Sequence, residues 1–507
     1  MRHFQRVQIA FVLANLLAWV SWATPAAFAQ AQPGDEEALT ALGMGEGATG
    51  TWAERRLEGR SYIFTDYRAA SDAGELTAEA LIIENPRMSE SGPMLDAIRL
   101  ERAVTTDGSG QGSFSYDRFE VEGPNATTAI AMPVFVQNKS LSSVDVDFAT
   151  LGFERFTIDG FTLNPGADDF SMTAERLVVT DLADLVAGSV EFIQVEMTQP
   201  PSGTESFEIA TFETLRVEGF DFSSGYPFGA GLSALSEDDS SSEFVARFSL
   251  WDAMILRNVE MSGGGMDMGF EEFRFETSET EAGRSTRVSL PGAYVASDEM
   301  ADAIDADAIA ITQALGIDEA FTMSLNLNLY HDFETDRLES RGENYLSMAE
   351  GRFIMHMDVA LVDYQAFEEA LSRLLAAQSP TEQQMATMGA MATYKIERFE
   401  LRMEENGLTD TLLAVAAEQE GRSVEEQRRI LREQYREDMA GLGKALPPAL
   451  ASQVQAAVLD WSDQGGTLTI ALEPETPMAV FTMLMAMGQG NLEPLGLSVS
   501  HQPHSRF

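Results

Sequence analysis

Strict alternation of apolar and polar residues is the feature that most constrains how this chain can fold. From about residue 52 to residue 290 the alternation runs in short stretches bounded by Gly, Asp, Asn and Ser, and few stretches suit a long helix. A period of two places every second side chain on one face of a β-strand. The sequence therefore predicts a large, twisted antiparallel sheet, a meander of hairpins with one apolar and one polar face.

Four stretches of this region resemble one another. They share a basic residue among alternating apolar ones, and three of them contain an acidic residue followed by glycine: residues 118–123 (RFEVEG), 155–161 (RFTIDGF), 215–220 (LRVEGF) and, more loosely, 257–261 (RNVEM). Their spacing along the chain is uneven. The sequence therefore indicates repeated strands, but not a solenoid of fixed period.

The phase of the alternation shifts within these stretches. Apolar residues before Gly160 are even-numbered (Phe156, Ile158), and those after it are odd-numbered (Phe161, Leu163). A two-residue hairpin turn at residues 159–160 would place Ile158 opposite Phe161 on one face. A bulge with a left-handed glycine would explain the same shift. Residues 218–219 carry a second shift of this kind, and both explanations preserve one apolar face.

After Ser297 the pattern becomes a mixture of helices and strands. Ser297 caps an expected helix whose apolar stripe includes Ile304, Ile311 and Leu315. Further strands are expected at 321–329, 337–345, 351–361, 394–404 and 467–472, and further helices at 363–376, after 380, and at 410–420, 423–442, 448–465 and 477–487. The predicted order is signal peptide (1–29), flexible leader (30–51), antiparallel β-repeat region (52–295), α+β region (296–500) with amphipathic helices packed on the sheet, and tail (501–507).

The first 29 residues have the pattern of a secretory signal. Arg2 and Arg6 are followed by an apolar stretch and by Ala27-Phe28-Ala29, a small-x-small cleavage pattern that would leave Gln30 as the new amino terminus. The chain is therefore expected in the periplasm. The alternative is a retained anchor, because residues 7–29 are long enough to span a bilayer, and only then would the protein contact the membrane.

Composition excludes several classes of function. The chain has 81 acidic and 33 basic residues, and such a negative field repels phosphate backbones and anionic lipid headgroups. Nucleic acid is therefore not an expected partner. Cysteine is absent, which excludes disulfides, thiolate metal sites and thiol catalysis.

Short motifs for catalysis or cofactor binding are weak in this chain. Residues 45–50 (GEGATG) match the dinucleotide fingerprint, but no strand precedes them and no βαβ unit follows, so they are assigned to the leader. Acidic groups at 237–239 and at Asp302, Asp305 and Asp307 resemble cation sites, yet a solvated loop and a solvent-facing helix surface explain them more simply.

The histidines and methionines offer three further candidates. His331 precedes Asp332, Glu334 and Asp336, a set that could bind a divalent metal, although a solvated hairpin loop is the favoured interpretation. His356 is expected on a sheet face. The remaining candidates lie near the carboxyl terminus or in methionine-rich stretches: His501 and His504 in a frayed tail, and Met266, Met268, Met483, Met485 and Met487, whose copper(I)-like spacing is better explained by core packing.

A resemblance covers the half of the chain after about residue 315. Residues 330–332 (YHD), 349–351 (AEG), 398–401 (RFEL), 405–408 (ENGL) and 466–474 (GTLTIALEP) resemble uncharacterised exported proteins of Gram-negative bacteria. These proteins are similar in texture to AsmA-like periplasmic β-repeat proteins. The resemblance implies long curved sheets and a role in envelope lipid transport or assembly, and it implies no catalytic residue.

The leading hypothesis is a non-enzymatic periplasmic protein whose apolar sheet face, or a groove in it, binds lipid or an envelope partner. One-sided alternation over this length motivates it. A structural or assembly scaffold of the envelope is the alternative, and a hydrolase with an unrecognised site is a further one. No catalytic, cofactor-binding or metal-binding residue is assigned, and no cofactor is expected.

Overall fold

The computed structural model describes most of the chain, and the remaining residues are not discussed structurally. The described residues are 35–45, 50–71, 74–107, 112–136, 150–164, 171–199, 208–221, 251–263, 266–297, 321–366, 389, 392–442, 448–489, 491 and 493–503. The predicted helices at 298–315 and after 380, most of the helix predicted at 363–376, the acidic groups at 237–239 and 302–307, and His504 lie outside this part.

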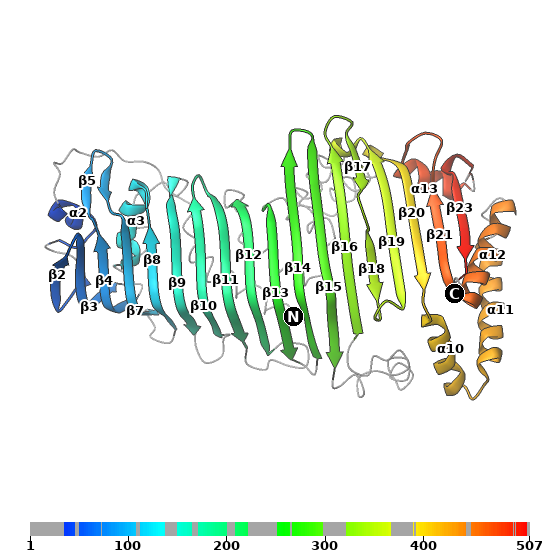
Figure 1. Cartoon of the computed structure of the whole chain (residues 1–507), viewed down its shortest axis with the longest axis horizontal. Helices are drawn as coiled ribbons and strands as arrows, with labels where there is room; N and C mark the ends of the chain where they lie inside the picture. Colours follow the sequence, from blue (N-terminus) through cyan, green and yellow to red (C-terminus); the bar gives the residue numbers. More distant parts are fainter. Residues whose placement is uncertain are drawn as a thin grey trace. The chain divides into compact units, whose positions relative to one another are not determined.

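The described chain is mainly antiparallel β-structure, which confirms the predicted fold class. Among the described residues, 21 strands form one antiparallel sheet, and several helices follow in the carboxyl-terminal part (Figure 1). The chain divides into two compact units, residues 1–264 and 265–507. This boundary lies ahead of the change of sequence pattern after Ser297.

The amino-terminal unit is a meander in which each long strand pairs with the next along the chain (Figure 1). A small separate hairpin, β5 (Arg87–Ser89) with β6 (Gly92–Met94), lies between β4 and β7. The sheet strands are β1 (Gly50–Thr51), β2 (Glu54–Glu58), β3 (Ser61–Ser71), β4 (Gly74–Glu84), β7 (Ala97–Asp107), β8 (Ser113–Glu122), β9 (Phe153–Asn164), β10 (Ser171–Leu182), β11 (Val186–Thr198), β12 (Ile209–Asp221) and β13 (Ala253–Gly263).

Two helices accompany this sheet. Helix α3 (Ala126–Val136) lies against its apolar side, where the buried Tyr67 hydroxyl donates a hydrogen bond of 2.7 Å to the Val136 carbonyl. Helix α2 (Asp35–Ala41) packs on the β5–β6 hairpin with Leu39 fully buried, and its Glu36 pairs with Arg55 of β2 at 2.6 Å. Residues 35–41 of the predicted leader therefore form a helix.

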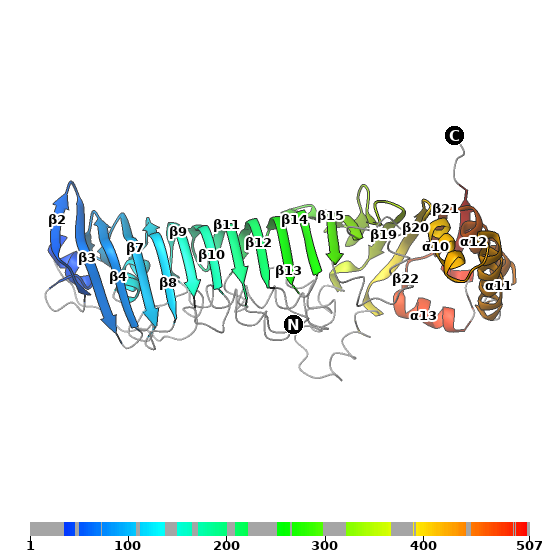
Figure 2. The same ribbon diagram turned by 90° about the horizontal axis from the view of Figure 1, so that it is seen from below.

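The carboxyl-terminal unit combines antiparallel strands with four helices among its described residues. Figure 2 shows these helices gathered around the last strands. The strands are β14 (Met266–Thr280), β15 (Gly283–Ser297), β16 (Phe321–Asp332), β17 (Arg337–Ser340), β18 (Tyr345–Met348), β19 (Phe353–Val362), β20 (Lys395–Glu405), β21 (Gly466–Leu472), β22 (Met478–Ala479) and β23 (Leu497–Gln502). The helices are α10 (Leu408–Gln419), α11 (Val424–Leu442), α12 (Pro448–Gln464) and α13 (Val480–Gly488).

The core of this unit forms where helices cover its last strands. Val454, Ala457 and Trp461 of α12 pack on Leu468 of β21 and Val499 of β23. The predicted cap of α11 is present, because the Glu426 amide donates to the Ser423 hydroxyl at 3.1 Å. The predictions for α10, α11 and α12 are confirmed to within a few residues.

Two local predictions were wrong. Residues 159–160 form no hairpin: they lie inside β9, where Ile158 pairs with Leu177 and Phe119 rather than with Phe161. Gly160 has a φ of 60°, so the left-handed glycine explains the shift instead. The tail is also not frayed at His501, which lies in β23 and pairs with Leu468. β23 is a short strand at the end of the chain, and each of its residues pairs with one of β21.

Candidate functional site: a repeated strand module

Nine strands of the amino-terminal unit share one seven-residue module. Its first residue is usually acidic, its third and fifth are apolar, and its seventh has a positive φ. The modules are 60–66 (RSYIFTD), 79–85 (EALIIEN), 96–102 (DAIRLER), 117–123 (DRFEVEG), 154–160 (ERFTIDG), 175–181 (ERLVVTD), 188–194 (GSVEFIQ), 213–219 (ETLRVEG) and 252–258 (DAMILRN).

Every seventh residue adopts the left-handed backbone conformation, with φ between 46° at Arg102 and 62° at Gly219. Side chains disfavour this region, and Gly, Asn and Asp tolerate it best. Seven of the nine modules end in one of these three residues, namely Asp66, Asn85, Gly123, Gly160, Asp181, Gly219 and Asn258.

Arg102 and Gln194 are thus the two exceptions, and each of the other seven seventh residues is Gly, Asn or Asp.

The strand register turns the module into two lines that cross the sheet. Because neighbouring strands are antiparallel, the first residue of each module lies opposite the seventh residue of the next. Gly160 shows this arrangement. Asp159 pairs with Arg176 and Phe161 pairs with Ala174, so Gly160 lies opposite Glu175. Line A contains Asp66, Glu79, Arg102, Asp117, Gly160, Glu175, Gln194, Glu213 and Asn258, and line B contains Arg60, Asn85, Asp96, Gly123, Glu154, Asp181, Gly188, Gly219 and Asp252.

Carboxylates of the first residues contact the left-handed residues beside them. The Asn85 amide donates to Asp96 at 2.7 Å, and Asn258 donates to Glu213. The same relation joins Arg102 to Glu79 as an ion pair. Residues of the two lines therefore interrupt the regular ladder of backbone hydrogen bonds, and their side chains also join neighbouring strands. We call these side-chain contacts joints.

Glycine joints are closed in a different way. A Cβ added at Gly160 would overlap the Asp117 carboxylate, and one at Gly219 would overlap that of Asp252. At Gly123 the Glu154 carboxyl carbon would lie 2.6 Å from such a Cβ. The acidic side chain of the neighbouring strand thus occupies the space that any other seventh residue would need.

The lines keep one face apolar along the whole unit. Each line shifts the alternation, so the third and fifth residues of every module point to the same side. Almost all of these side chains are buried, and the row of fifth residues shows this well: Phe64, Ile83, Leu100, Val121, Ile158, Val179, Phe192 and Val217. The apolar face is therefore the core of this unit.

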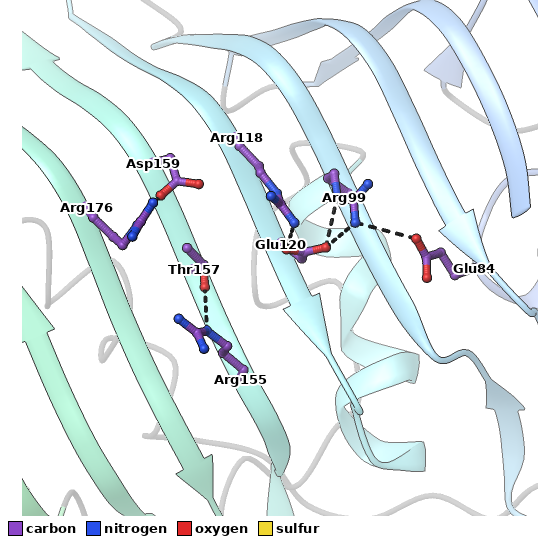
Figure 3. A network of polar contacts seen from close by, with 8 residues as sticks. All are labelled: Glu84, Arg99, Arg118, Glu120, Arg155, Thr157, Asp159 and Arg176. Atoms are coloured by element: carbon purple, nitrogen blue, oxygen red, sulfur yellow. Dashed lines mark hydrogen bonds and ion pairs between the residues drawn. The ribbon is translucent and has the colours of Figure 1, made fainter.

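The opposite face carries a network of charges between the two lines (Figure 3). Glu120, only 4% exposed, lies at its centre and accepts a hydrogen bond of 2.9 Å from Arg99 Nε. Arg118 bonds the other oxygen of the same carboxylate, and Arg99 also lies 3.5 Å from Glu84. One buried carboxylate is thus held by two guanidinium groups, as favourable burial of a charge requires.

The network continues onto β9 and β10. Arg176 Nε donates to Asp159 at 2.5 Å, and Arg155 Nε donates to the Thr157 hydroxyl at 3.3 Å (Figure 3). Thr157 lies opposite Glu120 in the register. These contacts use the second, fourth and sixth residues of adjacent modules, so the module that builds the core also builds the charged face.

The electrostatics of this network favour permanent ion pairs. Burial acts to lower the pKa of Arg99, but the hydrogen bond and the charge of Glu120 outweigh it and leave the pKa raised above its ordinary value. The hydrogen bond and the charge of Asp159 raise the pKa of Arg176 in the same direction. Both oxygens of Glu120 accept hydrogen bonds from guanidinium groups, so this cluster suits recognition and stabilisation.

The structure places His331 differently from the solvated loop that the sequence favoured. His331 is 5% exposed, its Nε2 lies 3.0 Å from Asp336 Oδ1, and the rings of Phe333 and Tyr364 meet it edge-on. Asp332 accepts hydrogen bonds from two backbone amides of the turn. Within the described part of the chain, no group of three or more His, Cys, Asp or Glu side chains is arranged to hold a metal ion.

The other predicted candidates take ordinary structural places. His356 lies in β19 with its Nε2 3.2 Å from Glu404, and His501 Nε2 donates to the Gly465 carbonyl at 2.8 Å. Met483 is buried against Leu495, whereas Met485 is exposed. Met266 and Met268 lie in β14, Gly45 lies in a bend and Gly50 in β1, and residues 46–49 and the side chain of Met487 lie outside the described part.

Sequence reasoning found parts of four modules, although residues 257–261 overlap the last of them only at residues 257–258, and it missed the other five. The missing signal was an acidic residue followed, six positions later, by Gly, Asn or Asp, with apolar residues at the third and fifth positions. Unequal connections hid it, because β5, β6 and α3 all lie between modules.

Part of the carboxyl-terminal unit matches a family model. Residues 349–502 match a family model described as "Uncharacterized protein". This match covers β19 to β23 with α10 to α13, and lies outside the repeated modules. No curated protein matches the chain. Among the helices that the structure describes, none has the length and apolar character to cross a bilayer.

Proposed function

We propose that this protein is a non-enzymatic, exported scaffold of the bacterial cell envelope. The observation that carries the proposal is the repeated module, which gives nine strands one buried apolar face and one charged face. Arrays of repeated units commonly supply extended binding surfaces. The secretory pattern of residues 1–29 supports the periplasmic location.

The charged face suits a protein partner better than a phosphate-rich one. Its arginines are neutralised by neighbouring carboxylates, as Arg176 is by Asp159, so the face offers many hydrogen-bonding groups without a strong positive field. Arginine is also enriched in protein interfaces. Side chains such as Arg155 and Arg216 are exposed and available to a partner.

A charge-reversal experiment tests the scaffold proposal. The chromosomal copy in the source bacterium is deleted and replaced by wild type, by Arg155→Glu, or by Arg68→Glu. Arg155 lies between lines A and B, whereas the matched control Arg68 is an exposed arginine that does not lie between them. Sensitivity to detergent measures envelope integrity, and far-ultraviolet circular dichroism confirms folding. We expect Arg155→Glu alone to behave like the deletion. If all three strains resist detergent equally, the proposal fails.

A lipid-binding role is the second candidate, and the continuous apolar band favours it. Nine strands spaced about 4.8 Å apart make this band roughly 40 Å long. The burial of its side chains favours the scaffold, because the band already serves as core. Mass spectrometry of organic extracts from protein purified out of the periplasm separates the two roles: co-purified lipid supports this one, and lipid-free protein excludes it.

The same preparation tests the export signal. We expect intact-mass measurement to find a chain beginning at Gln30, and fractionation to recover it with periplasmic proteins. An uncleaved chain in the membrane fraction would instead support the retained anchor.

A further inference from the structure

We infer that the amino-terminal sheet is a tandem array of interchangeable modules, extended or shortened by two strands at a time. The joint between modules is the contact between a left-handed seventh residue and the first residue that faces it. This inference concerns the architecture, and it stands whether or not the scaffold proposal holds.

The joints have a local twofold relation that makes modules interchangeable. In β8 and β9, Asp117 faces Gly160 on line A, and Glu154 faces Gly123 on line B. Each strand therefore gives one acidic residue and receives one. The same arrangement joins β4 to β7 through Glu79 and Arg102 on one line and Asp96 and Asn85 on the other.

Connections between modules do not affect the joints. The link from β10 to β11 is a tight turn in which the amides and carbonyls of Ala183 and Val186 bond each other. The link from β8 to β9 contains helix α3, and the link from β4 to β7 contains the β5–β6 hairpin. All three pairs place the first residue of one module opposite the seventh residue of the other, so the register does not depend on the link.

A two-strand step preserves strand direction and both lines. Strands β10 and β12 run the same way, with Glu175 and Glu213 on line A and Asp181 and Gly219 on line B. Replacing the first half of one module by that of the other leaves an acidic first residue and a left-handed glycine. Removal of one strand alone would reverse the direction of everything after it.

Two deletions that differ by one residue test the inference. Removing residues 177–214 joins Arg176 to Leu215 and creates the hybrid module ERLRVEG, in phase with its neighbours. Removing residues 177–213 instead joins Arg176 to Thr214. The hybrid module then has eight residues, so the two lines are one residue too far apart on this strand. Both variants are made in the full chain, and thermal unfolding is followed by circular dichroism.

We expect the in-phase variant to unfold cooperatively at a higher midpoint than the out-of-phase variant. Equal midpoints, or the reverse order, would overturn the inference. A pair of substitutions decides the matter if neither deletion folds. Gln194→Gly relieves a left-handed side chain and should raise the midpoint of the full chain, whereas Ile193→Gly, in regular strand next to it, should lower it. If both substitutions lower the midpoint equally, the inference is wrong.

Discussion

At the scale of single residues, backbone conformation determines which residue types the seventh position accepts. Asparagine at 85 and 258 tolerates a positive φ and uses its amide to bind the facing carboxylate. Arg102 accepts more strain and compensates through its ion pair with Glu79. Glycine avoids the strain and leaves room for a carboxylate, as at Gly160.

Gly160→Ala tests this account. The added methyl group would be strained at a φ of 60° and would displace the Asp117 carboxylate, so we expect a loss of about 2 kcal/mol in the free energy of unfolding. Gly59→Ala is the control, because Gly59 has a φ of 62° with no atom near its missing Cβ. Denaturant unfolding should show a loss of only about 1 kcal/mol there. Equal losses would refute the role of the carboxylate.

Tyr67 gives a prediction for alkaline pH. Burial raises the pKa of this phenol above its ordinary value, so the folded chain retains a proton that the unfolded chain releases above about pH 10. Its stabilising contribution is complete below that pH and is lost as the pH rises further. We expect Tyr67→Phe to cost about 1 kcal/mol at pH 8, through the lost bond to Val136, and to weaken the decline in stability between pH 9 and pH 11. Unfolding measured across this range would contradict us if both proteins declined equally.

At the scale of elements, each strand contributes to a core on one face and to a charge network on the other. Position four of the module provides the clearest case, because Arg99, Glu120 and Thr157 are consecutive in the register. Glu120 is buried although it points away from the apolar face, and Arg99 and Arg118 bond its two carboxylate oxygens. The stability of the buried Glu120 carboxylate therefore depends on Arg99 and Arg118.

Glu120→Ala should destabilise the protein. The change leaves Arg99, whose side chain is only 23% exposed, without its main partner, and we expect a loss of about 2 kcal/mol. Glu101→Ala, on the same face, should change the unfolding free energy by less than about 0.5 kcal/mol. Chemical denaturation of both variants measures the difference. A loss no larger than that of the control would show that the network contributes little.

At the scale of the whole molecule, charge affects stability. The formal net charge is −48, and like charges repel each other in the compact state more than in the unfolded chain. Salt screens this repulsion, with a Debye length of about 10 Å at 0.1 M. We expect the thermal midpoint to rise between about 0.02 M and 0.5 M sodium chloride. A constant or falling midpoint would show that local ion pairs outweigh the net charge.

One edge strand in each unit is protected against further pairing. Strand β2 (Glu54–Glu58) is short and charged, as natural edge strands often are. At β23, the Gln453 side chain of α12 donates to the Val499 carbonyl at 2.8 Å. Each edge is therefore poorly suited to pairing with another strand.

The sequence by itself determined the fold class, because a period of two allows only strands, and it determined the helices α10 to α12 through capping residues and helical spacing. It also located the phase shifts at Gly160 and Gly219. Tertiary structure decided how the chain resolves those shifts. A hairpin and a left-handed residue within one strand produce the same apolar pattern, and only the pairing of Ile158 with Leu177 distinguishes them.

The nine modules also became visible only in the structure. Their linkers differ in length, so the sequence has no fixed period, whereas the antiparallel register aligns every first residue with a seventh. The alternation found in the sequence revealed only part of this arrangement, namely the apolar side of each strand. The contacts between each strand and the next supplied the rest, because the joints depend on which carboxylate lies beside which left-handed residue.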